Sequence, residues 1–264
     1  MVNKIENFIS KFYLILVFIF LYAPIAALIV FSFNDSKSMA KWNGFTFKWY
    51  ISLFQDDRIL TALYYTVVVA ILSAIIATIL GTVGAIGIHK SRSFKKKFML
   101  NVNYLPVLNP DIVTGIALMS LFTFFSISKG FLTMLLAHIA FNVPYVILSV
   151  LPKLHQLPPN IEEAALDLGA SPNYTLRKII LPQIAPGIIA GFLIAFTMSI
   201  VDFVISFFDT GGDVTNLSVE IYSMARRGIK PEINALSTIM FLAVLILLFI
   251  VNKKQSVLRG DNIE

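Results

Sequence analysis

Two acidic residues stand inside stretches of the sequence that are otherwise apolar. Asp111 follows the proline-containing segment NYLPVLNP, and Asp202 lies in AFTMSIVDFVISFF, directly before Phe203. An ionisable side chain inside a membrane is costly, and it is by default a candidate for function. Carboxylates beside aromatic rings suit an organic cation, because the face of a ring attracts ammonium groups. The alternative for each acid is a structural hydrogen bond or a pairing with a neighbouring span.

The same sequence offers little for catalysis, metal binding or nucleotide binding. It has no cysteine, which excludes a thiol nucleophile and a cysteine metal site. Its histidines, His89, His138 and His155, are too scattered for metal-ligand spacing, and core or surface roles are favoured. The segment GTVGAIG lacks the lysine of a phosphate-binding loop, and its glycines favour close helix packing instead. We therefore expect no enzymatic activity and no cofactor bound by this chain.

The composition is that of a membrane protein. Of the 264 residues, 57% are hydrophobic and only 14% are charged, and the mean hydropathy is +0.81. A soluble domain has about a quarter of its residues charged. The formal net charge of +6 therefore indicates basic cytoplasmic loops that face anionic lipid, rather than a nucleic-acid partner.

Apolar runs long enough to cross a bilayer predict an all-α, polytopic membrane protein with six transmembrane helices. The predicted spans are 12–33, 62–88, 104–125, 131–151, 187–208 and 234–252. The third contains Pro106 and Pro110, and such a break is tolerated only where protein or a watery cavity satisfies the freed backbone groups. Basic residues gather in the loop HKSRSFKKK, in the loop after the fourth span and near both termini. These parts are therefore predicted to face the cytoplasm.

A polar passage, NIEEAALDLGASPNYTLRKIILP, separates the fourth and fifth predicted spans. Asn160 is suited to cap a helix, and Glu163 would complete a capping box. Gly169 predicts a left-handed stop for this helix. Ser171 predicts the cap of a second helix, which we expect to end before Pro182. Two short helices joined at a glycine corner fit a re-entrant or interfacial connector as well as a docking element.

The residues of this passage resemble the EAA motif of ABC importer permeases. The matching positions are Glu163, Ala164, Ala165, Gly169, Ile179, Leu181 and Pro182. In that family the passage forms a coupling helix that docks into a cleft on a separate ATPase subunit. The resemblance therefore implies a type I ABC importer permease fold, with ATP and Mg bound by the partner ATPase. It argues against an ion-coupled secondary carrier, which is the alternative from another class.

Further segments extend the resemblance over nearly the whole chain and narrow it to the spermidine/putrescine type, specifically the second membrane subunit. They are FNDSKSMAKWNGFTFKWY, NPDIVTGIAL, AFTMSIVDFVISFF and IYSMARRGIKPEINALST. The resemblance implies that cargo passes Asp202 and Asp111, with Phe203 beside them and Trp42 as an outer aromatic contact. The family often has two adjacent acids where this chain has Val201 and Asp202. An importer of another small solute is therefore the alternative within the class.

The resemblance also implies an organisation and a set of partners. The chain divides into a first span with an outer loop (1–61), a transmembrane core with the coupling helix (62–252) and a cytoplasmic tail (253–264). Expected partners are a homologous second permease, two ATPase subunits, an extracytoplasmic polyamine-binding protein and the lipid bilayer. The outer pair Arg226 and Arg227 either contacts the binding protein or is solvated. The expected location is a bacterial inner or plasma membrane, crossed several times, with both termini in the cytoplasm.

The predicted orientation can be tested by labelling single cysteines, because the chain has none of its own. Lys96→Cys and Ser171→Cys should react with an impermeant maleimide only from the cytoplasmic side. Lys41→Cys, in the first outer loop, should react only from outside and serves as the control. Labelling of Ser171→Cys in intact cells would contradict both the orientation and the docking role of the passage.

Overall fold

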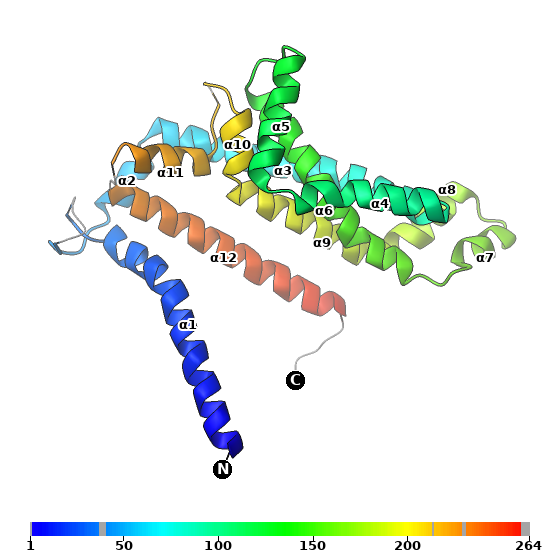
Figure 1. Ribbon diagram of the computed structural model, residues 1–264, viewed down its shortest axis with the longest axis horizontal. Helices are drawn as coiled ribbons and strands as arrows, with labels where there is room; N and C mark the ends of the chain where they lie inside the picture. Colours follow the sequence, from blue (N-terminus) through cyan, green and yellow to red (C-terminus); the bar gives the residue numbers. More distant parts are fainter. Residues whose placement is uncertain (1, 37–40, 213, 229–230, 260–264) are drawn as a thin grey trace. The chain divides into compact units, whose positions relative to one another are not determined.

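The regular elements of the computed structural model are helices throughout the part of the chain that it describes, which confirms the all-α class (Figure 1). That part comprises residues 2–36, 41–212, 214–228 and 231–259. The helices are α1 (Val2–Ser32), α2 (Lys48–Leu53), α3 (Asp57–Lys90), α4 (Ser93–Leu108), α5 (Asp111–Phe124), α6 (Phe131–His155), α7 (Ile161–Asp167), α8 (Pro172–Tyr174), the π-helix η1 (Thr175–Ile180), α9 (Leu181–Val201), α10 (Val204–Asp209), α11 (Leu217–Arg226) and α12 (Pro231–Arg259). Of the predicted cytoplasmic tail, residues 260–264 lie outside the described residues.

Among the described residues, four helices are long and apolar enough to cross a membrane, and the bent pair α4–α5 makes a fifth if it counts as one span. The four are Ser10–Ser32, Asp57–Lys90, Phe131–His155 and Pro172–Val201. The last predicted span, 234–252, lies within α12, where the apolar helix Pro231–Ile246 is shorter. The full set of six spans therefore stays a prediction.

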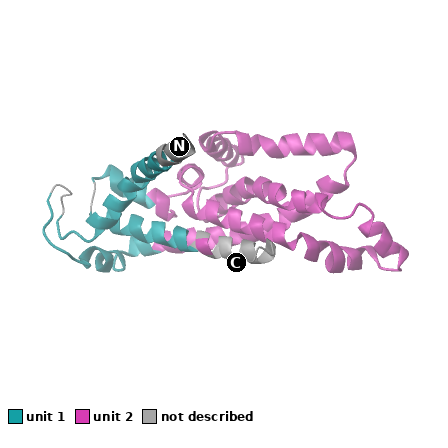
Figure 2. Cartoon of the chain, turned by 90° about the horizontal axis from the view of Figure 1, so that it is seen from below, with its two compact units in different colours: residues 1–60, 220–247 teal, residues 61–219, 248–264 magenta. Residues whose placement is uncertain are grey.

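The chain forms two compact units, which Figure 2 shows in different colours. Unit 1 comprises residues 1–60 and 220–247, and unit 2 comprises residues 61–219 and 248–264. In unit 1 the indole N–H of Trp49 donates to the carbonyl oxygen of Asn34 at 2.8 Å, and Trp49 is buried. The hydroxyls of Ser32 and Tyr50 lie 2.7 Å apart. These bonds hold α2 against the C-terminal end of α1.

Close backbone contacts join α3, α6 and α9 in unit 2. A Cβ placed on Gly81 of α3 would lie 2.6 Å from Cβ of Val146 in α6, and one placed on Gly191 of α9 would lie 3.2 Å from Cα of Val146. Small residues allow such approaches, and van der Waals packing rather than the hydrophobic effect drives helix association in a membrane. The predicted close packing of the GTVGAIG segment is confirmed at Gly81.

A buried polar cluster joins the same three helices farther along. The side-chain amide of Asn142 in α6 donates to Oγ of Ser199 in α9 at 2.8 Å, and Ser199 Oγ lies 3.1 Å from Oγ of Ser73 in α3. All three residues are almost fully buried. A group that finds its partners inside the protein avoids the cost of an unpaired polar atom in an apolar medium. The three helices therefore form one packed block.

The third predicted span is broken, as its prolines suggest. Helices α4 and α5 meet at an angle of 104° across Asn109 and Pro110. Asn109 has an extended backbone with ψ 142°, as expected for a residue that precedes proline. Pro106 stays inside α4, so the second proline and not the first makes the break. Asp111 is consequently the first residue of α5.

The fifth predicted span differs from the sequence-based prediction at both ends. The expected stop before Pro182 is wrong, because α8, η1 and α9 form one continuous helix, Pro172–Val201, with Pro182 in the first turn of α9. Proline lacks an N–H and clashes with the carbonyl four residues earlier, and the wider π-helical turn relieves both conflicts. At the outer end, this span is not continuous to residue 208 but breaks at Asp202 and Phe203.

The Gly81 contact predicts a strong positional difference between two glycines of α3. Gly81→Ala should drive a methyl group into Val146 and cost about 1–3 kcal/mol, as overpacked cores do. Gly87→Ala is the matched control, because a Cβ there meets no atom within 4 Å. The measurement is the apparent melting temperature of the purified protein. Equal melting temperatures for the two variants would contradict the packing described.

Candidate functional site

The carboxylate of Asp202 bonds the backbone at the break in the fifth span. Its Oδ1 accepts from the N–H of Ile205 at 3.2 Å, and its Oδ2 accepts from the N–H of Ser206 at 2.8 Å. The hydroxyl of Ser206 also donates to Oδ2 at 2.7 Å. A new helix start leaves backbone N–H groups without partners, and a carboxylate there satisfies them and suits the positive end of the helix dipole.

Asn216 ties the following loop to the same break. Its side-chain amide nitrogen donates to the carbonyl oxygen of Asp202 at 2.8 Å and to Oγ of Ser206 at 2.7 Å. Its Oδ1 accepts from the N–H of Val219 at 2.9 Å, at the start of α11. Asn216 is 2% exposed, so this one side chain holds the break, α10 and α11 together.

His138 of α6 completes the network from the neighbouring span. Its Nε2 lies 3.0 Å from Oγ of Ser206 and 3.5 Å from Oδ2 of Asp202. Because the Ser206 hydroxyl already donates to Asp202, it accepts from His138, which places a hydrogen on Nε2. The other ring nitrogen, Nδ1, is buried and has no hydrogen-bond partner among the described residues. A neutral ring with its hydrogen on Nε2 satisfies this arrangement, whereas a protonated ring would bury an unpaired N–H.

The network shows Asp202 in a structural role in this conformation. Its side chain is 6% exposed, and its carboxylate already accepts three hydrogen bonds. Contact between Asp202 and cargo would require the exchange of some of these partners, and it stays a prediction. The partners His138, Ser206 and Asn216 were not predicted as site residues. The sequence does show polar residues in apolar surroundings at these positions, which is the signal that could have found them. It does not show which of these residues bond to one another.

Asp111 is placed next to this break but is bonded differently. Helix α5 packs against α10, since a Cβ on Gly115 would lie 3.0 Å from Cδ2 of Phe208 and 3.5 Å from Cα of Ile205. The first turns of α5 and α10 therefore lie side by side, as Figure 1 also shows. The Asp111 side chain is exposed, and it makes no hydrogen bond to another described residue. The structure thus brings both predicted acids to adjacent helix starts and leaves one of them open.

The predicted aromatic contacts divide between the two units. Phe203 is half-buried at the break, with its ring centroid 5.5 Å from that of Phe207. Trp42 belongs to unit 1 and is 50% exposed. Phe203 thus lies next to Asp202 at the break, and the cargo roles of both Phe203 and Trp42 stay predictions.

In the passage 160–182, called the coupling passage below, the structure has the predicted glycine corner but not the predicted cap of the first helix. Gly169 has a φ of +85°, which confirms the left-handed stop after α7. Ser171 Oγ accepts from the N–H of Tyr174 at 3.3 Å, which confirms the second cap. The capping box is wrong, because the side chain of Asn160 makes no cap hydrogen bond. At this end the chain instead makes a turn in which the N–H of Ile161 donates to the carbonyl oxygen of Pro158 at 3.2 Å.

The passage exposes an unusually apolar surface beyond the ends of the spans. Leu168 is 90% exposed and Tyr174 is 56% exposed. A hollow of about 550 Å³ lies around the glycine corner. Its lining consists of Ala165, Leu168, Gly169, Ala170, Ser171, Tyr174 and Ile179. Of the other predicted coupling residues, Glu163, Ala164 and Pro182 are exposed, and Leu181 packs partly against the core. Exposed apolar surface of this kind is typical of a contact with another protein or with the membrane.

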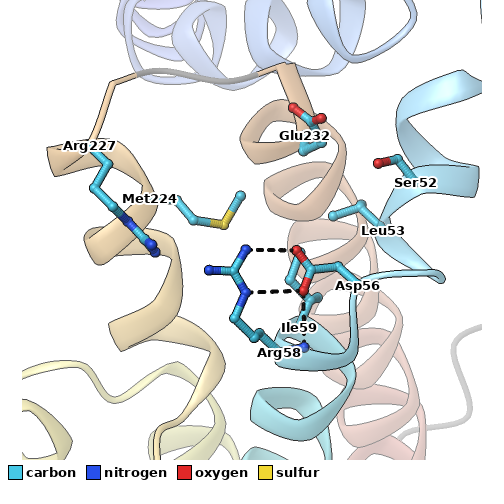
Figure 3. Close-up of a pocket in the computed structure, with 8 residues that line it drawn as sticks. All are labelled: Ser52, Leu53, Asp56, Arg58, Ile59, Met224, Arg227 and Glu232. Carbon is cyan, nitrogen blue, oxygen red and sulfur yellow. Dashed lines mark hydrogen bonds and ion pairs between the residues drawn. The ribbon is translucent and has the colours of Figure 1, made fainter.

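A small charged pocket of about 130 Å³ lies in unit 1 (Figure 3). Arg58 donates two hydrogen bonds to the carboxylate of Asp56, from Nε to Oδ1 at 3.4 Å and from Nη2 to Oδ2 at 3.2 Å. Partial burial raises the pKa of the Asp56 carboxyl, but the hydrogen bonds and charge of Arg58 outweigh it and hold this pKa below its ordinary value. Arg227, predicted either to contact the binding protein or to be solvated, is exposed and donates to Glu220 at 3.0 Å. Within the described residues, no three acidic or histidine side chains gather closely enough for a metal ion.

Residues 77–257 match the family described as binding-protein-dependent transport system inner membrane component. The chain is 40% identical, over 88% of both chains, to the spermidine/putrescine transport system permease protein PotC of Escherichia coli (strain K12). It is 36% identical to PotC of Haemophilus influenzae, over 94% of this chain and 98% of that protein. It is 39% identical to the putrescine transport system permease protein PotI of Escherichia coli (strain K12), over 90% of this chain and 87% of that protein.

Solved structures share the fold at low sequence identity. A chain of a bacterial ABC transporter involved in the import of the acidic polysaccharide alginate matches with a TM-score of 0.76 and 17% identity, over 98% of this chain and 97% of that one. A chain of the MetNI methionine ABC transporter, in an inward-facing conformation, matches with a TM-score of 0.63 and 16% identity, over 76% of this chain and 98% of that one. The fold is therefore that of the type I ABC importer permeases.

Substitution of Asp202 separates its two roles. If the carboxylate binds cargo, Asp202→Asn removes a charge-assisted hydrogen bond of about 1.5–3 kcal/mol and slows uptake roughly ten- to a hundredfold per assembled complex. If it only bonds the first turn of α10, the amount of assembled complex falls instead. Asp202→Glu keeps the charge and should retain part of the activity. The measurement is initial uptake of labelled spermidine and putrescine, normalised to assembled complex.

Asp209→Asn is the matched control, because it makes the same side-chain change at the other end of α10. The Asp209 carboxyl is fully buried, and neither oxygen has a hydrogen-bond partner among the described residues. The control should leave both assembly and uptake within about twofold, since it removes no hydrogen bond. Normal uptake per complex in Asp202→Asn would remove Asp202 from the cargo contacts.

Proposed function

We propose that this chain, which belongs to the family of binding-protein-dependent transport system inner membrane components, carries polyamines into the cell as a permease subunit of an ABC importer. The cargo class is inferred from relatives named for spermidine and putrescine, which are 36–40% identical over most of the chain. Two carboxylates and an aromatic ring at adjacent helix starts support an organic cation as cargo.

One continuous helix carries the proposal. Pro172–Val201 begins directly after the glycine corner of the coupling passage and ends at the break with Asp202. Its packing against α6, at Gly187 and Gly191, makes it part of the packed block of spans. A push on the apolar surface around Gly169 therefore reaches the acidic break through a rigid element. This connection is what an importer needs if a separate motor is to change the access to cargo.

Cargo is proposed to meet Asp111 first. The Asp111 carboxylate is open, whereas that of Asp202 is engaged in the network with His138 and Ser206. An ammonium group bound at Asp111 leaves the methylene stem of a polyamine free to lie against apolar and aromatic surface near Phe203. Asp202 would take part when the spans move and its partners exchange.

The proposed assembly has three further subunits and an external supplier of cargo. A homologous second permease completes the passage, and two ATPase subunits bind ATP and Mg and dock on the coupling passages. A polyamine-binding protein delivers cargo from outside the membrane. The amino and carboxyl termini of this chain are proposed to lie in the cytoplasm of a bacterial cell. ATP binding would draw the coupling passages together and open the spans outward.

Uptake by the reconstituted complex tests this function. Proteoliposomes with the complete assembly should accumulate labelled spermidine or putrescine only with ATP. Gly169→Asp should abolish ATP-dependent uptake, because a side chain at φ +85° costs on the order of 1 kcal/mol and the added charge meets the carbonyl end of α7. Gly169→Asn is the matched control, since asparagine has a similar backbone cost at this φ and adds no charge.

The expected pattern is inserted protein in both variants, lost coupling in Gly169→Asp and substantial coupling in Gly169→Asn. Lost coupling means either ATP hydrolysis without uptake or release of the ATPase. Accumulation of neither amine by the wild-type complex would reject the proposed cargo. Wild-type uptake in Gly169→Asp, with the ATPase retained, would reject the docking role of the corner.

A further inference from the structure

The coupling helix α7 is attached to the spans by a single described side-chain bond. Lys90 at the C-terminal end of α3 donates from Nζ to Oε1 of Glu162 at 2.5 Å. Among the described residues, no other side-chain hydrogen bond joins α7 to another helix. Glu163, the residue that the sequence motif singles out, is exposed and has no such bond in the described part of the chain.

Beneath this ion pair lies a cavity rather than packed side chains. The cavity has a volume of about 360 Å³ and separates α7 from the ends of α3 and α6. Its lining consists of Ile86, His89, Lys90, Leu154, His155, Leu157, Pro158, Pro159, Ile161, Glu162 and Ile180. Helix α7 contacts η1, but toward the ends of α3 and α6 it faces this cavity. The ion pair bridges the cavity at its rim.

The charges around the cavity are otherwise basic. The rings of His89 and His155 lie 5.3 Å apart, and Nζ of Lys96 lies 3.1 Å from Nε2 of His155. A lysine ammonium has no acceptor, so His155 accepts with a neutral Nε2. Glu162 is the one acidic residue in the described lining. It therefore offsets the positive charge of Lys90 and of the nearby Lys96.

We infer that the Lys90–Glu162 ion pair is the strut that positions α7 and transmits its movement to α3. This inference rests on the proposed function of α7 as part of the coupling passage. The neighbouring acids divide their roles: Glu162 points back to the spans, and the exposed Glu163 is left for the ATPase partner. Both side chains of the pair are partly exposed, so the pair contributes to coupling geometry more than to folding.

Charge reversal and charge exchange test the strut. Glu162→Gln and Lys90→Gln should each lower uptake per ATP hydrolysed by about two- to fivefold, the range expected for an exposed ion pair. Glu162→Lys should lower it by about tenfold, and more than Lys90→Glu does, because it adds a cation beside Lys90 and Lys96. The exchanged pair, Lys90→Glu with Glu162→Lys, should restore the ratio to within about twofold of wild type.

A matched control comes from the same cytoplasmic segment. Lys97→Glu makes the same charge change in α4 at an exposed position outside the cavity lining, and it should leave uptake per ATP unchanged. A purely structural role would lower the amount of assembled complex and leave uptake per ATP intact. The ratio therefore separates positioning from folding.

A second measurement is independent of cargo. A nitroxide at Asp167→Cys, on the full-length chain in nanodiscs, reports the mobility of α7. Mobility should increase in Glu162→Lys and return to the wild-type value in the exchanged pair, while Lys97→Glu should leave it unchanged. This measurement stands even if wild-type complexes accumulate neither spermidine nor putrescine, which would reject the proposed function alone. Unchanged mobility in Glu162→Lys, or failure of the exchanged pair to restore it, would overturn the strut.

Discussion

The carboxylate of Asp202 supplies hydrogen bonds that a continuous fifth span would have made within its own backbone. A bilayer offers no water to a broken helix, so every freed N–H needs a partner inside the protein. Asp202 bonds the N–H groups of Ile205 and Ser206, and Asn216 bonds the carbonyl oxygen of Asp202 in return. The break, the direction of α10 and the placement of the following loop all depend on this exchange. The same requirement explains why polar residues gather here in a chain that is 57% hydrophobic.

The break has a functional consequence because a second break lies beside it. Helix α5 starts at Asp111 after the 104° bend, and it packs on α10 through Gly115. Helix starts present positive dipole ends and, here, one engaged and one open carboxylate. In the proposed transport cycle, a cation between this chain and a second permease would be attracted by the exposed Asp111, and Asp202 would become available only after its hydrogen-bond partners exchange. An acid that changes its partners between conformations is suited to alternating access, since cargo and protein then compete for the same oxygens.

Close contacts hold the spans of this region together. Gly81 of α3 and Gly191 of α9 pack closely against Val146 of α6. The side-chain amide of Asn142 donates to the hydroxyls of Ser73 and Ser199. By contrast, α7 stands over a cavity and is bonded to α3 through Glu162 and Lys90. The molecule thus combines a stiff block with a loosely packed coupling helix. The π-helical turn in η1 lies between them, and wide turns of this kind are frequent at functional sites.

The sequence by itself determined the all-helical class, the kink near Pro110, the positive φ of Gly169 and the cap at Ser171, because each depends on a local rule of backbone sterics or hydrogen bonding. Local rules failed where longer-range partners competed. The Asn160 cap is absent because a turn from Pro158 sets the chain direction, and Pro182 does not end a helix because the π-helical turn accommodates it. Only the tertiary structure decided which groups meet across the fold: His138 with Ser206, Asp111 beside the start of α10, and Glu162 rather than Glu163 with Lys90. His138 and Ser206 are 68 residues apart along the chain and Lys90 and Glu162 are 72 residues apart, and no periodicity or spacing encodes such pairs. They form because buried polar groups must find partners wherever helix packing brings them together.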